Sequence, residues 1–182
     1  QVDKIPVMKI LTEIHRSPGV KIQGKTVYRT AVKGVILRGR TLLMVYSSKV
    51  DHYDFPGGGL QEGETHSQGL YREILEECGM SVAYIGPELG VVVEYDFPIE
   101  PGYDLFKMTS HYYQCEVQDG LVPQKLEDYE QELGFTPVWV DLDHALQRNR
   151  TVLHSDDAPK WLKKEVFVLE YIRRNILLAL EP

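Results

Sequence analysis

Residues 58–80 read Gly-Gly-Leu-Gln-Glu-Gly-Glu-Thr-His-Ser-Gln-Gly-Leu-Tyr-Arg-Glu-Ile-Leu-Glu-Glu-Cys-Gly-Met, and this stretch decides the fold. Three carboxylates and an arginine crowd its second half: Arg72, Glu73, Glu76 and Glu77. Like charges four residues apart destabilise an isolated helix. We therefore expect a positive partner, and a divalent cation that prefers oxygen ligands is the natural candidate.

The stretch predicts a helix from Thr65 to Cys78 with specified ends. Thr65 and Gln68 fit a capping box, and Gly79 fits the left-handed position that follows a helix. On a helical wheel the apolar residues share one face, predicted to pack on a sheet: Leu70, Tyr71, Ile74, Leu75 and Cys78. The charged residues share the other face, predicted to face solvent: Arg72, Glu73, Glu76 and Glu77.

The composition bounds the class of protein. A length of 182 residues fits one domain with a proper core, and 43% hydrophobic with 26% charged residues indicates a soluble globular chain. The net charge of −7 argues against a general nucleic-acid or anionic-membrane binder. It leaves a nucleotide substrate possible, because a bound metal can invert the local charge.

Cysteine usage and hydropathy bear on location. The two cysteines, Cys78 and Cys115, are too few for a disulfide scaffold, which predicts a reduced, cytoplasmic protein. No apolar run of about 18 residues predicts a membrane span, and the N-terminus lacks a signal-peptide pattern. The sequence begins at Gln1 and Met8 is internal, so the native start is open.

Periodicity and breakers predict the remaining elements. Strands are expected at residues 26–37, 41–47, 81–95, 104–117 and 135–140, with a short helix at 142–147. Residues 6–16 fit a strand or a helix, and the acidic stretch 121–134 fits a loop with some helix. This pattern of many strands and separated helices predicts a mixed sheet with helices packed on it.

A final helix is expected from Pro159 to about Leu180, since proline suits a first helical turn. Its apolar stripe comprises Trp161, Leu162, Val166, Leu169, Ile172, Ile176 and Leu180. This apolar stripe is expected to pack against another apolar surface. Packing on its own domain is the first interpretation, and a homodimer contact is the second.

The whole pattern from Gly58 to Met80 is Gly, five residues, Glu, seven residues, then Arg-Glu-aliphatic-x-Glu-Glu-x-Gly-aliphatic. It resembles the signature of the Nudix (MutT-like) hydrolase family. The resemblance implies an α/β fold, an α/β/α sandwich with a mixed β-sheet. It implies one domain over 1–182 with a core at about 26–148, an N-terminal extension at 1–25 and a C-terminal helix at about 159–180.

The resemblance also implies a chemistry. Family members typically use Mg²⁺ or Mn²⁺ to hydrolyse a nucleoside diphosphate linked to another group, X. By position, Glu73, Glu76 and Glu77 resemble the metal ligands, and Gly58 resembles the residue that offers its carbonyl. Glu73 or Glu77 is then the candidate general base, and Arg72 the residue that holds the acids in place. Glu64 is expected to be structural or in the outer shell.

Residues outside the motif supply further candidates. Many members add an acidic residue from a distant loop, and the candidates here are Glu127, Asp128, Glu130 and Glu132, of which we favour Glu130 and Glu132. Arg29 and Lys49 are candidates for contacts with substrate phosphates from the sheet side.

Two other functions compete with a hydrolase. A non-catalytic nucleotide sensor on this fold would usually lose acidic residues from the motif, and this chain keeps all of them. An isopentenyl-diphosphate isomerase-like enzyme would need a cysteine ahead of the motif, where neither Cys78 nor Cys115 lies. The substrate stays open between nucleoside triphosphates, ADP-ribose and related nucleotides.

Overall fold

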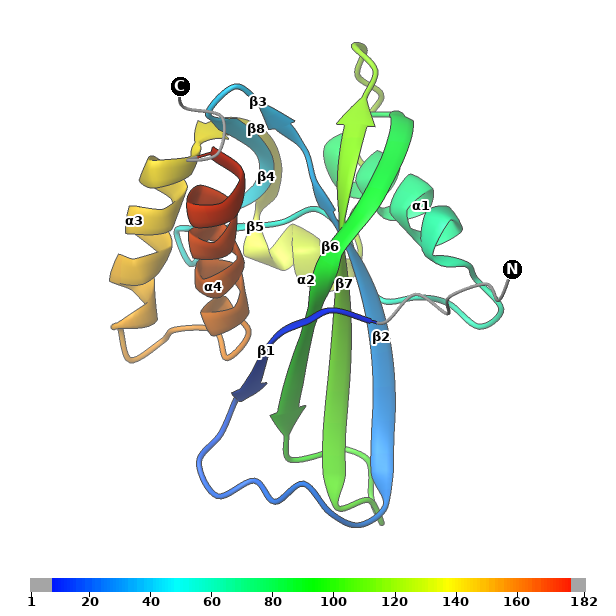
Figure 1. Ribbon diagram of the computed structural model, residues 1–182, viewed down its shortest axis with the longest axis vertical. Helices are drawn as coiled ribbons and strands as arrows, with labels where there is room; N and C mark the ends of the chain where they lie inside the picture. Colours follow the sequence, from blue (N-terminus) through cyan, green and yellow to red (C-terminus); the bar gives the residue numbers. More distant parts are fainter. Residues whose placement is uncertain (1–7, 178–182) are drawn as a thin grey trace, which may run out of the picture.

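A computed structural model describes residues 8–177 of the chain, which form two four-stranded sheets with helices on both sides (Figure 1). The strands are β1 (Ile10–His15), β2 (Thr26–Val35), β3 (Leu37–Arg38), β4 (Thr41–Ser47), β5 (His52–Asp54), β6 (Val82–Asp96), β7 (Leu105–Val117) and β8 (Phe135–Asp141). The helices are α1 (His66–Cys78), α2 (Asp128–Leu133), α3 (Leu142–Leu153) and α4 (Leu162–Ile172), which a short π-helical turn, Arg173–Leu177, extends.

The first sheet has the strand order β1-β6-β7-β2 and mixes the two strand directions. The predicted pair at 81–95 and 104–117 is the long antiparallel hairpin β6–β7. Strand β1 lies parallel to β6, and β2 lies parallel to β7. In the second sheet β4 pairs antiparallel with β3, β5 and β8. The expected α/β class and mixed sheet are confirmed.

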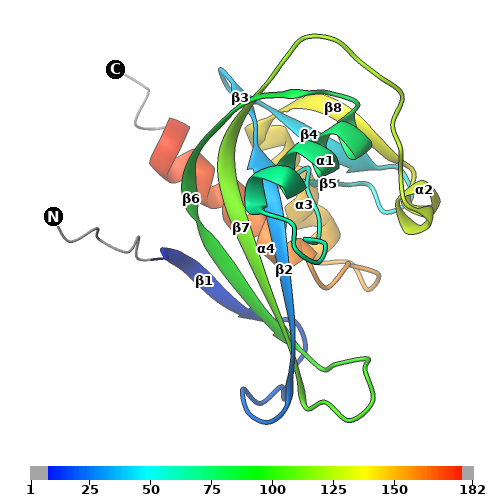
Figure 2. The ribbon, with the colours of Figure 1, turned by 90° about the vertical axis from the view of Figure 1, so that its right-hand side faces the viewer.

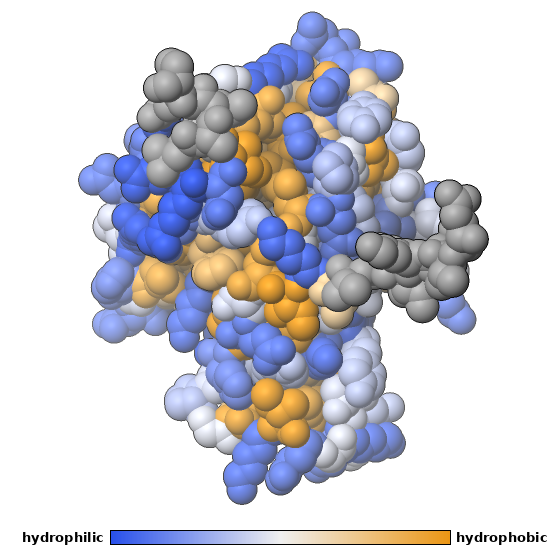
Figure 3. Space-filling view, in the orientation of Figure 1, coloured by the Kyte–Doolittle hydropathy of each residue, from blue (hydrophilic) through white to orange (hydrophobic). Residues whose placement is uncertain are grey.

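Helices cover the sheets from opposite sides. Helix α1 lies on one side, and α3 and α4 lie together on the other (Figures 1 and 2). Because side chains alternate along a strand, Val32 and Ile36 join the core cluster that contains Leu70 of α1. Val35 joins the cluster that contains Leu169 of α4. Figure 3 shows apolar side chains in a band down the middle of one face, with hydrophilic side chains beside it.

The ends of α1 are as the local rules predict. Thr65 is the N-cap and forms a capping box with Gln68, and Gly79 ends the helix with a φ of 64°. The predicted apolar face is only partly right. Leu70, Ile74 and Cys78 are buried, whereas Tyr71 and Leu75 are 48% and 39% exposed, because the sheet covers a narrower stripe of the helix than the wheel suggests.

Three other predictions are settled or corrected. Residues 10–15 form a strand and not a helix. Helix α3 continues to Leu153, past the predicted end at residue 147. Its N-cap is Asp141, whose side chain accepts hydrogen bonds from the Asp143 and His144 N–H groups. Helix α4 begins at Leu162, and Pro159 belongs to a preceding turn in which its carbonyl accepts from the Leu162 N–H at 3.0 Å.

The apolar stripe of α4 packs on its own domain, as first interpreted. Four of its members are buried: Leu162, Val166, Leu169 and Ile172. Ile176 packs against the core cluster that contains Val166, Leu169 and Ile172. Leu180, the last member of the predicted stripe, lies outside the described residues.

Candidate metal and diphosphate site

Three carboxylates from two helices meet beside the loop of Gly57, Gly58 and Gly59, called the glycine loop below. Glu73 and Glu77 come from α1 and Glu130 comes from α2, and one oxygen of each lies within 4.8 Å of the others. They are only 7%, 4% and 3% exposed. Three buried acids so close together repel one another unless a cation joins them, and hard divalent cations bind through carboxylate oxygens of this kind.

The glycine loop folds over Glu77 and buries it. Oε2 of Glu77 accepts a hydrogen bond from the Gly57 N–H at 2.7 Å. The Lys33 ammonium, on strand β2, donates to the backbone carbonyls of Phe55 at 3.0 Å and Gly57 at 2.5 Å. The expectation that Glu77 faces solvent is therefore wrong, and it is wrong for Glu73 as well, which is also buried. A helical wheel gives the direction of a side chain, but it does not show the loop that covers it.

At two positions of this loop a side chain would clash, with backbone at Gly57 and with the end of the Glu73 side chain at Gly58. A Cβ on Gly57, whose φ is 130°, would overlap the carbonyl oxygen of Val32, and a Cβ on Gly58 would lie 2.7 Å from the Glu73 carboxylate. The loop can therefore lie against both β2 and α1. The Gly58 carbonyl, a predicted metal ligand, accepts from the Val32 N–H at 3.0 Å, which leaves its second lone pair open.

Arg72 ties the acidic side chains together. Its guanidinium makes two 2.8 Å hydrogen bonds to Glu64, one of 2.6 Å to Glu73 and one of 3.3 Å to Glu76. It also donates to the Gly59 carbonyl at 3.0 Å. The hydrogen bonds from Arg72 lower the pKa of Glu64 to about 2. A planar fork of donors suits this arrangement better than a lysine would.

The electrostatics of the cluster favour a cation. Burial raises the pKa of Glu77 well above its ordinary value, although the Lys33 ammonium opposes that effect. Burial also raises the pKa of Glu73, against the opposing effect of Arg72. Burial alone would lower the pKa of Lys33, but the surrounding carboxylates, Glu77 first, raise it. Lys33 therefore stays protonated and contributes a positive charge close to these carboxylates.

The structure separates the other predicted site residues. Of the two favoured acids near residue 130, Glu130 joins the cluster and Glu132 is exposed outside it. Glu76 contacts Arg72 but is not part of the cluster. Arg29 lines the cavity above the cluster and lies 3.7 Å from Glu100. Lys49 is exposed and does not line this cavity. The roles of these residues stay predictions.

Two adjoining cavities meet at the glycine loop. One, of about 530 Å³, is lined by Glu73, Glu130, Arg72 and Arg29. The other, of about 200 Å³, is lined by Lys33, Asp54, Trp161, Lys164 and Glu165 among others. Gly58, Gly59 and Tyr129 line both. A ligand can therefore extend from the carboxylate cluster into the smaller cavity.

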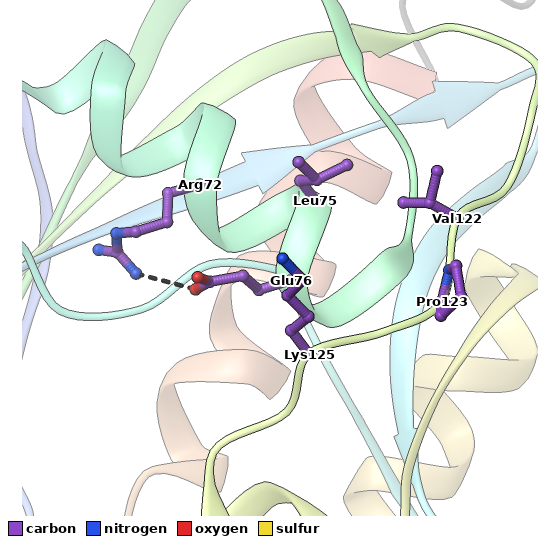
Figure 4. Close-up of a pocket in the computed structure, with 6 residues that line it drawn as sticks. All are labelled: Arg72, Leu75, Glu76, Val122, Pro123 and Lys125. Carbon is purple, nitrogen blue, oxygen red and sulfur yellow. Dashed lines mark hydrogen bonds and ion pairs between the residues drawn. The ribbon is translucent and has the colours of Figure 1, made fainter.

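A separate cavity of about 410 Å³ lies on the outer side of α1 (Figure 4). Leu75, Val122 and Pro123 form apolar walls, and Glu76 with its ion-pair partner Arg72 lies at one end. Glu73, Glu77 and Glu130 do not line it, so it is not part of the cluster.

Five charged residues that line the smaller cavity lie outside the motif: Arg16, Lys33, Asp54, Lys164 and Glu165. A signal was present for three of them. Lys33 interrupts an apolar strand, and Lys164 and Glu165 lie inside the apolar stripe of the last helix. A charge within an apolar run is costly to bury without a partner, so each of these positions indicates a buried polar contact.

The comparisons with known proteins agree with this geometry. A sequence model of the NUDIX domain matches residues 27–162, which is more than half of the chain. The chain belongs to the Nudix family. The expected family is therefore confirmed.

Individual relatives of known name match only part of this chain. An RNA pyrophosphohydrolase from Sulfurovum sp. (strain NBC37-1) is 36% identical over 83 residues, which are 42% of this chain and 53% of that protein. One from Helicobacter pylori (strain P12) is 46% identical over 46 residues, 25% of this chain and 30% of that protein. The chain thus spans about half or less of the length of these relatives.

Among solved structures, a Nudix hydrolase from Nitrosomonas europaea is similar in fold, with a TM-score of 0.56 and 17% identity. The match covers 86% of this chain and 97% of that one. At this identity the likeness concerns the fold alone. Within residues 8–177, no helix is long and apolar enough to cross a membrane.

Proposed function

We propose that this Nudix hydrolase uses a divalent metal, Mg²⁺ or Mn²⁺, to cleave the diphosphate linkage of a nucleoside diphosphate linked to X. The observation that carries the proposal is the buried cluster of Glu73, Glu77 and Glu130. Its donor set is all carboxylate oxygen, which suits Mg²⁺ or Mn²⁺ better than a soft metal.

The residues of the chain divide the work around that ion. Glu73, Glu77 and Glu130 would hold the ion, with Glu76 and the Gly58 carbonyl as further predicted ligands. The bound metal would neutralise the diphosphate oxygens and lower the pKa of a water molecule. Arg72 orients Glu73 through its 2.6 Å hydrogen bond.

Glu73 and Glu77 remain the two candidates for the general base. Burial raises the pKa of each above its ordinary value, and a carboxylate with a raised pKa is a stronger base. Arg29, on the wall of the larger cavity, is the candidate for a contact with a substrate phosphate, and Lys49 is a weaker one because it does not line that cavity. Glu132 is a weaker candidate than Glu130 for the added acidic residue because it lies outside the cluster.

The identity of X is the finer part of the proposal. Nucleoside triphosphates, ADP-ribose and related nucleotides fit a cavity of about 530 Å³, within the range of about 300–1,000 Å³ typical of small-molecule sites. A 5′-phosphorylated RNA end is a second candidate, because the relatives quoted above are named RNA pyrophosphohydrolases. The net charge of −7 speaks against extended RNA contacts.

A phosphate-release screen tests the proposal. The panel contains nucleoside triphosphates, ADP-ribose, sugar nucleotides, dinucleoside polyphosphates and a 5′-triphosphorylated RNA oligonucleotide, each with Mg²⁺, Mn²⁺ or a chelator. We expect metal-dependent release from at least one small nucleotide, and loss of it in Glu77→Gln. Release from the RNA alone would favour the second candidate. Release from none of them would contradict the enzyme assignment.

A cytoplasmic location and a homodimer complete the proposal. Cys78 and Cys115 are both free and buried, which suits a reducing compartment. Size-exclusion chromatography with light scattering at several concentrations tests the dimer. A monomer at all of them would contradict it.

A further inference from the structure

A group of four polar side chains lies between the start of helix α1 and the β6–β7 hairpin. It consists of His66 on α1, Glu88 on β6, and His111 and Tyr113 on β7. Tyr113 packs against the core cluster that contains Leu70 of α1, and side chains alternate along a strand, so His111 lies on the same face of the sheet. None of the four lines either cavity of the candidate metal and diphosphate site, so that site does not account for the group.

One carboxylate orients both imidazoles of this group. The ring centroids of His66 and His111 lie 4.4 Å apart. One oxygen of Glu88 lies 3.1 Å from Nδ1 of His111, and the other accepts a 3.1 Å hydrogen bond from the Tyr113 hydroxyl. Nδ1 of His66 lies 2.8 Å from that hydroxyl oxygen. Because the carboxylate only accepts and the hydroxyl proton is already donated, both Nδ1 atoms act as donors. The Nε2 atom of each neutral ring is then the nitrogen with the free lone pair.

Both Nε2 atoms are without a partner in the part of the chain that the structure describes. The hydrogen bonds and ion pairs of the two rings all involve Nδ1. Burial, and then the charge of His111, lower the pKa of His66, so its ring is neutral at pH 7. Neither side chain is fully buried, and the pair is therefore accessible to an ion from solvent.

The chemistry of the pair selects a metal ion that prefers nitrogen ligands. Imidazole suits Zn²⁺, Cu²⁺ and Ni²⁺, whereas Mg²⁺ and Mn²⁺ prefer oxygen. A metal-bound histidine almost always donates its other ring N–H to an acceptor such as a carboxylate, and Glu88 plays that part here, directly for His111 and through Tyr113 for His66. With Zn–N bonds of about 2.0–2.1 Å, two imidazoles on one tetrahedral ion have centroids about 5 Å apart. The observed 4.4 Å is close to that separation.

We propose that His66 and His111 bind one Zn²⁺ ion through their Nε2 atoms, with water molecules in the remaining coordination positions. Glu88 and Tyr113 are the positioning residues of this site. His66 begins helix α1 and His111 lies within β7, so the ion joins the start of the helix to the sheet. The site uses nitrogen ligands where the carboxylate cluster offers oxygen, and it does not depend on the proposed hydrolase activity.

The test is NMR of isotope-labelled histidine rings during a titration with Zn²⁺. Ring nitrogens report this site alone, because the carboxylate cluster contains no histidine. Mg²⁺ is present in excess throughout, so that the carboxylate oxygens are occupied. We expect the Nε2 resonances of His66 and His111 to shift together and saturably. The other four histidines of the chain should not shift at these concentrations: His15, His52, His144 and His154.

Variants separate the ligands from the positioning residues. His111→Gln and His66→Gln should each weaken Zn²⁺ binding at the remaining ring by about tenfold or more, and Glu88→Gln should weaken it by about 10–100-fold. The matched control is His154→Gln, which should leave the affinity unchanged. His154 is exposed and its Nδ1 also has an acceptor, the Arg150 carbonyl at 2.7 Å, but among the described residues it lies beside no second imidazole. Chemical-shift dispersion shows whether each variant is folded.

A shift of neither ring or of only one ring would overturn the proposal. So would a shift of His154 at the same Zn²⁺ concentrations, which would indicate surface binding to single histidines, or an unchanged affinity of His66 in His111→Gln. The wild-type titration keeps the proposal testable if a histidine variant does not fold. Glu130→Gln separates this site from the carboxylate cluster: it should abolish metal-dependent turnover and keep the Zn²⁺-induced shifts of both rings, and loss of those shifts would contradict an independent site.

Discussion

At the scale of single residues, Lys33 does most to organise the site. It lies within an apolar strand and is half-buried, and the charges of Glu77, Glu165, Asp54 and Glu73 raise its pKa against the effect of burial. Its ammonium also holds the Phe55 and Gly57 carbonyls. The acids on both sides of the glycine loop therefore share one internal cation.

Lys33→Met should lower the free energy of unfolding by about 3–5 kcal/mol, because it leaves buried carboxylates without their partner. Urea denaturation measures this. The exposed Lys163→Met should stay within about 0.5 kcal/mol of the wild type. Equal midpoints for the two variants would show that Lys33 is not the internal counter-ion.

Arg72 has a different role, because it works through geometry as much as charge. Arg72→Lys keeps the charge and loses the fork to Glu64, so it should lower the free energy of unfolding by about 1–3 kcal/mol at neutral pH. The surface pair of Arg150 and Glu170 supplies the control: Arg150→Lys should cost less than about 1 kcal/mol. A similar loss in both variants would contradict the anchoring role of Arg72.

The same contact has a pH dependence with a defined sign. The pKa of Glu64 is lowered in the folded state from 4.5 to about 2. Its contribution to stability is therefore present above pH 4.5 and is lost as the pH falls towards 2. The stability difference between wild type and Arg72→Lys should shrink over that interval. A constant difference in urea titrations across it would argue against the Glu64 contact.

At the scale of elements, local rules predicted the two ends of helix α1 correctly. They did not predict the tertiary contacts that bury its side chains. Thr65, Gln68 and Gly79 act within a few residues, so the sequence fixes where the helix starts and stops. The burial of Glu77 depends instead on the Gly57 N–H, twenty residues away. The acidic run likewise offered Glu130 and Glu132 equally, and only the fold of α2 against α1 separates them.

The glycine loop gives a matched pair of variants at this scale. Gly58→Ala would place a Cβ 2.7 Å from the Glu73 carboxylate, while Gly59→Ala would meet nothing within 4 Å. We expect Gly58→Ala to weaken Mn²⁺ binding by about tenfold or more, since it displaces a predicted ligand. Gly59→Ala should bind as the wild type does. Calorimetric titration with Mn²⁺ measures both, and equal affinities would contradict the predicted packing.

At the scale of the whole molecule, helix α4 links the C-terminal part of the chain to the site. Glu165 accepts from the Phe55 N–H, 110 residues away, and Lys164 reaches Glu94 of β6. The pattern of strands and helices predicted a mixed sheet with helices packed on it, and the family resemblance implied the α/β/α sandwich. The sequence could not predict these links, because an apolar stripe shows that a helix is buried but not which strand it covers.

Glu165 also gives stability a pH dependence. Burial, with Asp54 nearby, raises its pKa from 4.5 to about 7, so the folded state holds a proton that the unfolded state releases. Its ionisation therefore reduces stability as the pH rises from 4.5 to about 7. Relative to wild type, Glu165→Gln should gain stability across that interval. Urea titrations that show a parallel pH dependence for both proteins would contradict this.

The central claim is that Glu73, Glu77 and Glu130 together hold the catalytic metal. The most direct measurement is phosphate release from the substrate found in the screen, at increasing concentrations of Mg²⁺ or Mn²⁺. It compares the wild type with Glu130→Gln and with the exposed control Glu116→Gln. The account predicts a loss of about 100-fold or more in Glu130→Gln, partly recovered at high metal concentration, and no change in the control. Metal-dependent release by Glu130→Gln equal to that of the wild type would contradict it.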